Sequence, residues 1–139
     1  MAEVERFSVS MAPGLLKSFD AYRKRRGYRT RSEGIRDALR RELVEAEWQA
    51  SGREVVGTVT LIYDHETREL TRVLTDIQHH HHGTVVCTTH VHLDGHNCLE
   101  VVVLKGPARQ IQSIADRLIA ARGVKHGRLV CTSTGKRLA

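Results

Sequence analysis

The sequence has no apolar stretch long enough to cross a membrane. Its longest uninterrupted aliphatic run is residues 101–104, whereas a membrane-spanning helix needs about 20 apolar residues. The first ten residues carry charges where a secretory signal would be apolar, so we expect a cytoplasmic protein with no membrane contact. The three cysteines cannot all pair. Without an export signal, they are expected to be reduced thiols that are either buried or bound to metal.

Histidine is absent before His65, and all nine histidines of the chain follow that point. Basic residues gather at the other end, because residues 1–41 hold 11 Lys and Arg against 5 Asp and Glu. A solubilising surface is the general explanation for such an excess. The uneven distribution favours two modules instead, a polyanion binder in residues 1–50 and a metal binder in residues 51–139.

The first module has the pattern of one short strand followed by two helices. Polar and apolar residues alternate over residues 6–11, which is typical of a half-buried strand. Pro13 suits the first turn of a helix that Gly27 ends. Thr30 or Ser32 can cap a second helix, which continues toward a linker near residue 50.

A single short strand leaves two unpaired edges, and a module of this size has too little core to be stable alone. We therefore expect two copies to pair their strands antiparallel into a two-stranded ribbon. Phe7, Val9 and Met11 would then point into a helical core. The outward face would consist of Arg6, Ser8 and Ser10. A ribbon of this width fits the DNA major groove, where arginine can read guanine with two hydrogen bonds.

Two segments of this module, FSVS and RRGYRTRSEGIRDALR, resemble the ribbon-helix-helix fold. The resemblance implies a β-α-α unit that dimerises through its strand and binds double-stranded DNA. It also places the start of the second helix, at Ser32, against a phosphate, as the dipole at a helix N-terminus favours.

The second module has the order βαββαβ, the split βαβ arrangement of ferredoxin-like and ACT-like domains. Together with the first module it makes the chain an α+β protein. Strands are predicted for residues 55–63, 84–93, 98–104 and 128–132, and helices for residues 67–78 and 108–122. Both helices would cover one face of the sheet. The other face would be free to pair with another subunit, so we expect assembly beyond a dimer.

Three potential metal ligands lie close together in this module. His90 and His92 are two residues apart in a predicted strand and therefore point to the same face. A short turn then brings Cys98 near His92. Two imidazoles and a thiolate make up three quarters of a metal site. The four consecutive histidines of residues 79–82 supply candidates for a fourth ligand, or are simply solvated surface histidines.

The other two cysteines, Cys87 and Cys131, are predicted to be core thiols, because Cys87 has the opposite parity to His90 and no histidine is near Cys131. No Ser or Cys lies beside a base in a recognisable catalytic motif. A closed site of four ligands also leaves no open position for a substrate. We therefore expect a protein that is not an enzyme.

The motifs QHHHH, HVH and CLEVVVLKG, with their spacing, resemble the NikR family of nickel-responsive repressors along essentially the whole chain. The resemblance implies that one Ni(II) per subunit is bound by His79, His90, His92 and Cys98. In the family, the first of these histidines faces the other three across a subunit boundary. This arrangement implies a homotetramer, a dimer of dimers, with the metal sites at its centre.

The resemblance also assigns supporting roles. Tyr63 and Glu100 would orient the ligands, although they also fit a half-buried aromatic and an ordinary salt-bridge partner. Glu33 and Asp37 match positions that bind a second cation, potassium, in family members, although acidic residues four apart on a helix are also a common solvated pattern. The resemblance also indicates Arg6 as the residue that reads bases.

The function that follows is a nickel-dependent repressor that binds a palindromic operator and shuts off nickel uptake. Three imidazoles and a thiolate would hold tetrahedral zinc equally well, and copper would bind more tightly than nickel. A zinc- or copper-responsive DNA-binding regulator, or a metal-storage protein, therefore remains the alternative.

Overall fold

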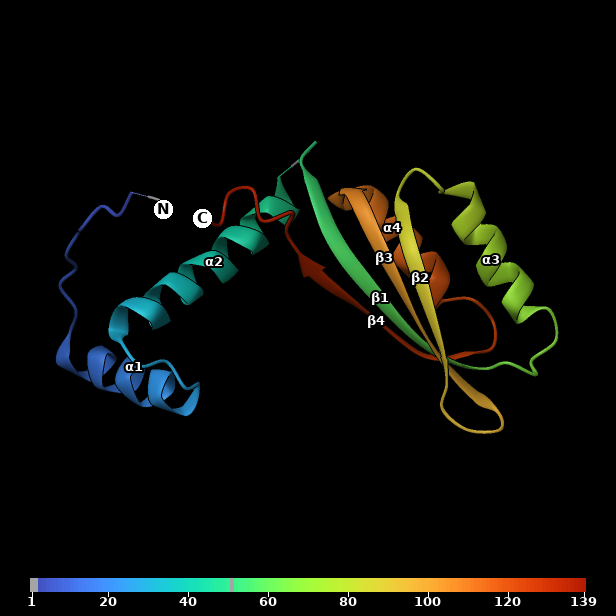
Figure 1. Ribbon diagram of the computed structural model, residues 1–139, viewed down its shortest axis with the longest axis horizontal. Coiled ribbons are helices and arrows are strands. Elements are labelled where there is room, and N and C mark those ends of the chain that lie inside the picture. Colours follow the sequence, from blue (N-terminus) through green and yellow to red (C-terminus); the bar gives the residue numbers. More distant parts are fainter. Residues whose placement is uncertain (1–2, 51) are drawn as a thin grey trace. The chain divides into compact units, whose positions relative to one another are not determined.

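The computed structural model describes residues 3–50 and 52–139, which divide into two units (Figure 1). One unit consists of residues up to Leu43 together with Arg137–Ala139, and the other is Val44–Lys136. None of the helices in the described residues has the length and apolar character needed to span a membrane.

Helix α1 (Pro13–Arg25) and the beginning of α2 (Arg31–Gln49) form the first unit. Pro13 lies in the first turn of α1, as predicted. Of the two predicted caps of α2, Thr30 is the one used. The N–H of Glu33 donates to Thr30 Oγ1 over 3.2 Å, and the N–H of Thr30 donates to the Glu33 carboxylate over 3.3 Å. This reciprocal capping box fixes where α2 begins.

The strand predicted for residues 6–11 is not formed within the single chain, where residues 3–12 are neither helix nor strand. A strand persists only when its backbone groups bond to a neighbouring strand, and the expected neighbour was the same segment of a second copy. Phe7 and Val9 are accordingly 75% and 59% exposed. The ribbon therefore stays a prediction about the dimer.

The second unit confirms the βαββαβ order. Its elements are β1 (Glu54–Asp64), α3 (Leu70–His80), β2 (Val85–His92), β3 (Asn97–Pro107), α4 (Ala108–Ile119) and β4 (Val124–Thr132). The strands form one sheet in the order β2-β3-β1-β4, and every pair of neighbours is antiparallel.

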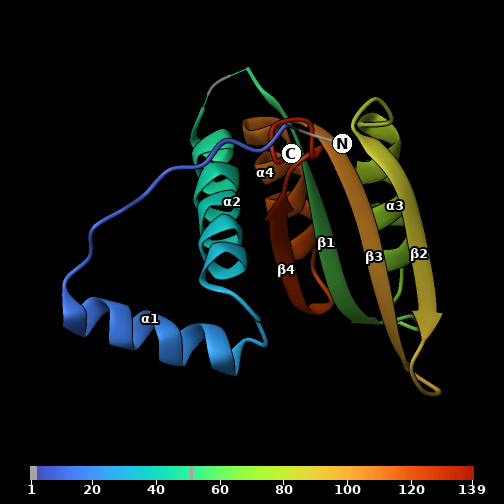
Figure 2. The ribbon, with the colours of Figure 1, turned by 60° about the vertical axis from the view of Figure 1, so that its left-hand side comes forward.

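Both helices of this unit pack on one face of the sheet (Figure 2). Alternate residues of the central strands β1 and β3, such as Leu61 and Val102, are buried against the apolar stripes of α3 and α4, which include Ile114 of α4. No described helix of the unit covers the opposite face, where Val91 and Val130 are 44% and 53% exposed. That face is the one predicted to meet another subunit.

Four element boundaries of this unit differ from the predictions by three residues or more. Strand β3 extends to Pro107 and not to residue 104, and α4 ends at Ile119 and not at residue 122. Helix α3 begins at Leu70 and not at residue 67, because Glu69 adopts a left-handed backbone conformation with φ 66°. Strand β4 begins at Val124 and not at residue 128. A Cβ atom at Gly127 would lie 2.7 Å from a side-chain atom of Ile119. Strand and helix therefore approach so closely that only glycine fits at this position.

The prediction that Cys87 and Cys131 are core thiols was wrong, since both are exposed. Cys87 pairs with Val103 after an irregularity in the β2–β3 ladder and lies on the sheet face that the helices leave open. Cys131 lies on the edge strand β4, where the sheet has a neighbour on one side only.

Candidate metal centre and nucleic-acid interface

The register of three strands brings the candidate metal ligands to one end of the helix-covered sheet face. Cys98 on β3 pairs with Tyr63 on β1 and with His92 on β2. Two residues away on the same face, His90 pairs with Glu100. Cys98 and Tyr63 are fully buried, and Glu100 is 6% exposed. The ordinary alternation of antiparallel strands therefore lines up a thiol, two imidazoles and a carboxylate.

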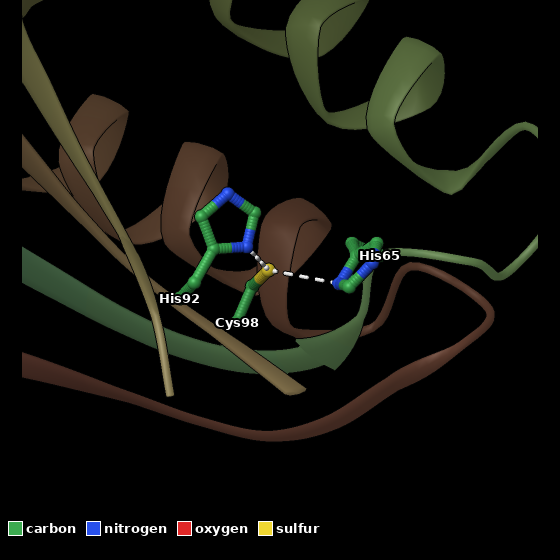
Figure 3. Close-up of side chains that lie close together, drawn as sticks. All are labelled: His65, His92 and Cys98. Carbon is green, nitrogen blue, oxygen red and sulfur yellow. Dashed lines mark hydrogen bonds between the residues drawn. The ribbon is translucent and has the colours of Figure 1, made fainter. Parts of the chain in front are cut away.

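The Sγ atom of Cys98 has two imidazole nitrogens around it (Figure 3). The Nδ1 atom of His92 and the Nδ1 atom of His65 each lie 3.4 Å from it. The three potential ligand atoms lie within 4.8 Å of one another, close enough to hold a metal ion. His92 and Cys98 were predicted as a pair, whereas His65 was not considered as a ligand.

His90 stands beside this cluster, with its ring centroid 5.2 Å from that of His92. The Tyr63 hydroxyl donates to Glu100 over 2.8 Å and lies 3.2 Å from Nδ1 of His90. Burial, and next the hydrogen bond to Glu100, raise the pKa of Tyr63. Because the phenol stays protonated and donates its O–H in a hydrogen bond to the carboxylate, its oxygen is left to accept from Nδ1–H of His90. That tautomer leaves Nε2 of His90 free to bind a metal ion.

Gln78, which is not among the predicted site residues, connects the end of α3 to the same network. Its amide nitrogen donates to Glu100 over 2.7 Å, and its amide oxygen accepts from the Thr88 hydroxyl over 2.6 Å. Gln78 directly precedes His79. The same buried carboxylate therefore supports His90 through Tyr63 and holds the helix end that carries His79.

His79 itself is exposed in the last turn of α3. It lines a shallow hollow with Thr75, Gln78, His82 and Val85. Among the residues that the structure describes, the group of three donors around Cys98 contains His65 and not His79. Of the four predicted ligands, only His92 and Cys98 belong to this group within one chain, and His90 lies beside it.

The predicted DNA contacts lie on the surface of the first unit. Arg6, Ser8 and Ser10 are exposed in the extended N-terminal segment, and Ser32 is exposed in the first turn of α2. Since Thr30 performs the capping, the Ser32 hydroxyl is not engaged as the cap of this helix.

The turn that leads into α2 is fixed by ion pairs. The Asp20 carboxylate accepts from Arg31 over 2.7 Å and from Arg23 over 2.8 Å. These hydrogen bonds, first the one from Arg31 and then the one from Arg23, hold the pKa of Asp20 well below its usual range. The helix start that would face a phosphate is thus attached to the side of α1.

Both acidic residues predicted for a second cation already have partners. The Glu33 carboxylate accepts from the backbone N–H of Arg29 over 2.9 Å and from that of Thr30. The Asp37 carboxylate accepts from the Tyr28 hydroxyl. In the described contacts, Glu33 and Asp37 therefore act as hydrogen-bond acceptors that stabilise the first unit.

The fold and the sequence matches together define a class of protein, a ribbon-helix-helix DNA-binding domain joined to an α+β domain of the βαββαβ type. Residues 5–46 match the ribbon-helix-helix proteins of the copG family. Residues 56–132 match the "NikR C terminal nickel binding domain". This second match spans more than half of the chain, which therefore belongs to the NikR family.

Curated relatives match this chain along nearly its whole length. The chain is 54% identical over 138 residues to a protein of Geobacter sulfurreducens and 52% identical over 138 residues to one of Geotalea uraniireducens. Each match covers 99% of both chains, and each relative is named "Putative nickel-responsive regulator". A solved structure of an uncharacterised Thermotoga maritima protein matches with a TM-score of 0.51 at 14% identity, covering 57% of this chain and 98% of that one. This last likeness concerns the fold alone.

Proposed function

We propose that the chain is a nickel-dependent repressor that binds a palindromic operator in double-stranded DNA and lowers the transcription of nickel-uptake genes in the cytoplasm. The observation that carries the proposal is the presentation of His90, His92 and Cys98 on one sheet face in a chain of the NikR family. The name shared by its relatives, nickel-responsive regulator, supports it. Residues 1–50 would bind DNA, and residues 51–139 would bind the metal and assemble the subunits.

One Ni(II) per subunit would be held by His90, His92 and Cys98 together with His79 of a neighbouring subunit. The donor set fits, since a buried thiol and imidazoles, of which His90 has its tautomer fixed by Tyr63, bind late first-row divalent ions well. Exposure of His79 at the end of α3 leaves it free to reach another chain. When bound, the ion supplies a bond between two subunits.

Within the chain, Tyr63 and Glu100 would position the metal ligands. Tyr63 directs Nε2 of His90 toward the ion, and Glu100 holds both that phenol and Gln78. Outer partners of this kind typically change metal affinity by about 10–100-fold. Gln78 in turn would fix the helix end from which His79 extends.

On the DNA side, a two-fold pair of N-terminal segments would read the two halves of a palindrome. Arg6, Ser8 and Ser10 would contact bases, and the start of α2 at Ser32 would contact a phosphate. A homotetramer, as a dimer of dimers, would carry two such ribbons. A potassium ion at Glu33 and Asp37 would have to use carboxylate oxygens that the capping box and Tyr28 leave free.

Metal and operator would be coupled through a shift in population. Nickel favours the tetramer arrangement in which both ribbons engage one operator, and it does so only through its different affinity for the two arrangements. The coupling is reciprocal, so operator DNA should raise nickel affinity by the factor by which nickel raises DNA affinity.

A gel-shift titration of a palindromic promoter fragment from a nickel-uptake operon tests the proposal, with metal-free protein, Ni(II), Zn(II) and Cu(II) in separate arms. We expect Ni(II) to tighten binding. His90→Ala should keep the salt-dependent nonspecific affinity and lose the tightening by nickel. A response to zinc or copper alone would favour a regulator of another metal, and metal binding without any effect on DNA would favour a storage protein.

A further inference from the structure

The last residues of the chain return to the second helix of the first unit. Arg137–Ala139 group with that unit, whereas residues 133–136 directly before them belong to the second unit. The Nε atom of Arg40 on α2 donates to the backbone carbonyl of Leu138 over 3.0 Å, so the end of the chain lies beside α2 (Figure 1). The chain therefore passes between the units twice, once inside α2 and once just before Arg137.

The surface of α2 that receives the end of the chain is a stripe along one helix face, with residues spaced by three or four positions. A shallow hollow of about 180 Å³ has among its lining residues Leu39, Leu43 and Leu138, together with Arg36, Arg40 and Arg137. Leu138 is half-buried, whereas the residues on either side of it are exposed. Leu138 therefore shares an apolar hollow with α2 in addition to the hydrogen bond.

A second contact ties the same segment to α2 about two helical turns further on. The indole Nε1 of Trp48 donates to the carbonyl of Thr132, the last residue of β4, over 2.8 Å, and both residues belong to the second unit. From Arg40 to Trp48 the helix rises by about 12 Å. From Thr132 to Leu138 the chain can extend over about 20 Å. One short segment therefore makes both contacts without being stretched.

Between these two contacts, α2 has little packing to stabilise it within the single chain. The side chains of residues 40–43 are all exposed, and the helix passes from one unit into the other directly after residue 43. Helices in proteins owe most of their stability to packing and not to intrinsic propensity. This stretch is therefore where α2 would most easily fray or bend if the end of the chain did not hold it.

We propose that residues 133–139 act as a strap that connects the end of β4 to α2 and keeps this helix continuous between the two units. Its regulatory role rests on the proposed function. If α2 bent freely, the DNA-binding unit could reach the operator-bound arrangement whether or not metal was bound, and the effect of metal on DNA affinity would shrink. The strap therefore increases the coupling between metal and operator.

The test uses two variants of the full-length protein, one that lacks residues 137–139 and one with Leu138→Ala. The first removes both the carbonyl acceptor and the apolar side chain, and the second removes only the side chain. The matched control is Lys136→Ala, because this exposed residue of the same segment carries a charge and lies outside the hollow. Hydrogen exchange followed by mass spectrometry reports on the amides of residues 40–47 in the metal-free protein without DNA.

We expect exchange in residues 40–47 to be about 3–10-fold faster in Leu138→Ala, and at least as fast in the shortened chain, since a partly buried leucine and one hydrogen bond contribute on this scale. The factor by which Ni(II) tightens operator binding in gel shifts should fall by at least about threefold in both variants. The affinity for Ni(II) alone, measured by competition with a chelator, should stay within about twofold and show that the second unit is intact. Lys136→Ala should behave as the wild type.

Unchanged exchange in both variants would overturn the strap, and faster exchange with an unchanged coupling factor would overturn its regulatory role. The strap and the repressor proposal can also fail separately. If exchange depends on Leu138 but Ni(II) has no effect on DNA binding by the wild type, the repressor proposal fails and the strap stands as a stabilising contact. If Ni(II) controls DNA binding and neither variant changes exchange or coupling, the strap alone is refuted.

Discussion

The two units differ in how much of their candidate site one chain can build. In the second unit, the pairing of β1, β3 and β2 aligns Tyr63, Cys98 and His92 within a single chain. In the first unit, the segment with Arg6 and Ser8 forms no strand, because its hydrogen-bond partners would belong to another copy. Metal-ligand geometry should therefore arise on folding, whereas the DNA-reading surface should depend on assembly and thus on protein concentration.

The substitution with the largest expected effect removes the thiol at the centre of the second unit's site. Cys98→Ala should abolish the near-UV charge-transfer band between thiolate and Ni(II), since Cys98 supplies the only thiol of the cluster. The control is Cys87→Ala, which removes an exposed thiol from the opposite sheet face. Absorption titration with Ni(II) checks the result, and a band that survives in Cys98→Ala would refute the ligand assignment.

A stability comparison tests whether only the second unit has a core of its own. Ile114 is fully buried between α4 and the sheet, so Ile114→Ala should lower the free energy of unfolding by about 2–5 kcal/mol at any protein concentration. Phe7→Ala removes a side chain that is 75% exposed in the single chain. Its effect should appear only at concentrations at which dimers form.

Urea unfolding followed by circular dichroism at two protein concentrations measures both variants. If Phe7→Ala destabilised the protein equally at both concentrations, the N-terminal segment would have to pack within its own chain. The contrast between the two units would then be wrong.

The sequence predicted the elements of the second unit well, because alternation along β1 and β3 and the apolar stripe of α4 agree with the burial that the sheet imposes. Its errors lie where one residue overrides a pattern. Glu69 delays the start of α3 through its left-handed conformation, and Gly127, just before the predicted start of the last strand, lies inside β4 where α4 packs closely on it.

For the candidate site, spacing within one hairpin was sufficient to pair His92 with Cys98. It could not identify His65, because that histidine follows another strand and reaches Cys98 only through the β1–β3 register. The parity of Tyr63 and His65 was the available signal, but it becomes informative only once the pairing of β1 with β3 is known. Long-range register is the information that a local pattern lacks.

A smaller effect is expected on DNA recognition by the first unit. Arg6→Ala should lose about 1–3 kcal/mol of discrimination between operator and mismatched DNA, the value of one bidentate contact to guanine. Nickel affinity should not change, because Arg6 lies in the other unit. Competition gel shifts against scrambled DNA measure the loss, with Arg68→Ala, an exposed arginine of the second unit, as the control. Equal weakening on all sequences would make Arg6 a phosphate contact.

The smallest effect concerns the stability of the first unit in acid. Arg31 and Arg23 depress the pKa of Asp20 in the folded protein. The ion pairs of Asp20 therefore contribute stability above the unfolded-state pKa, and this contribution is lost progressively as the pH falls toward the lower folded-state pKa.

Asp20→Asn removes the titrating group, so the helical signal of this variant should change less between neutral and acidic pH than that of the wild type. Asp20 is near the surface, so added salt should shrink the difference. Circular dichroism during acid titration at low and high salt checks this, with Asp76→Asn on α3 as the control. An identical acid response in wild type and Asp20→Asn would mean that the turn before α2 is held by its capping box rather than by its ion pairs.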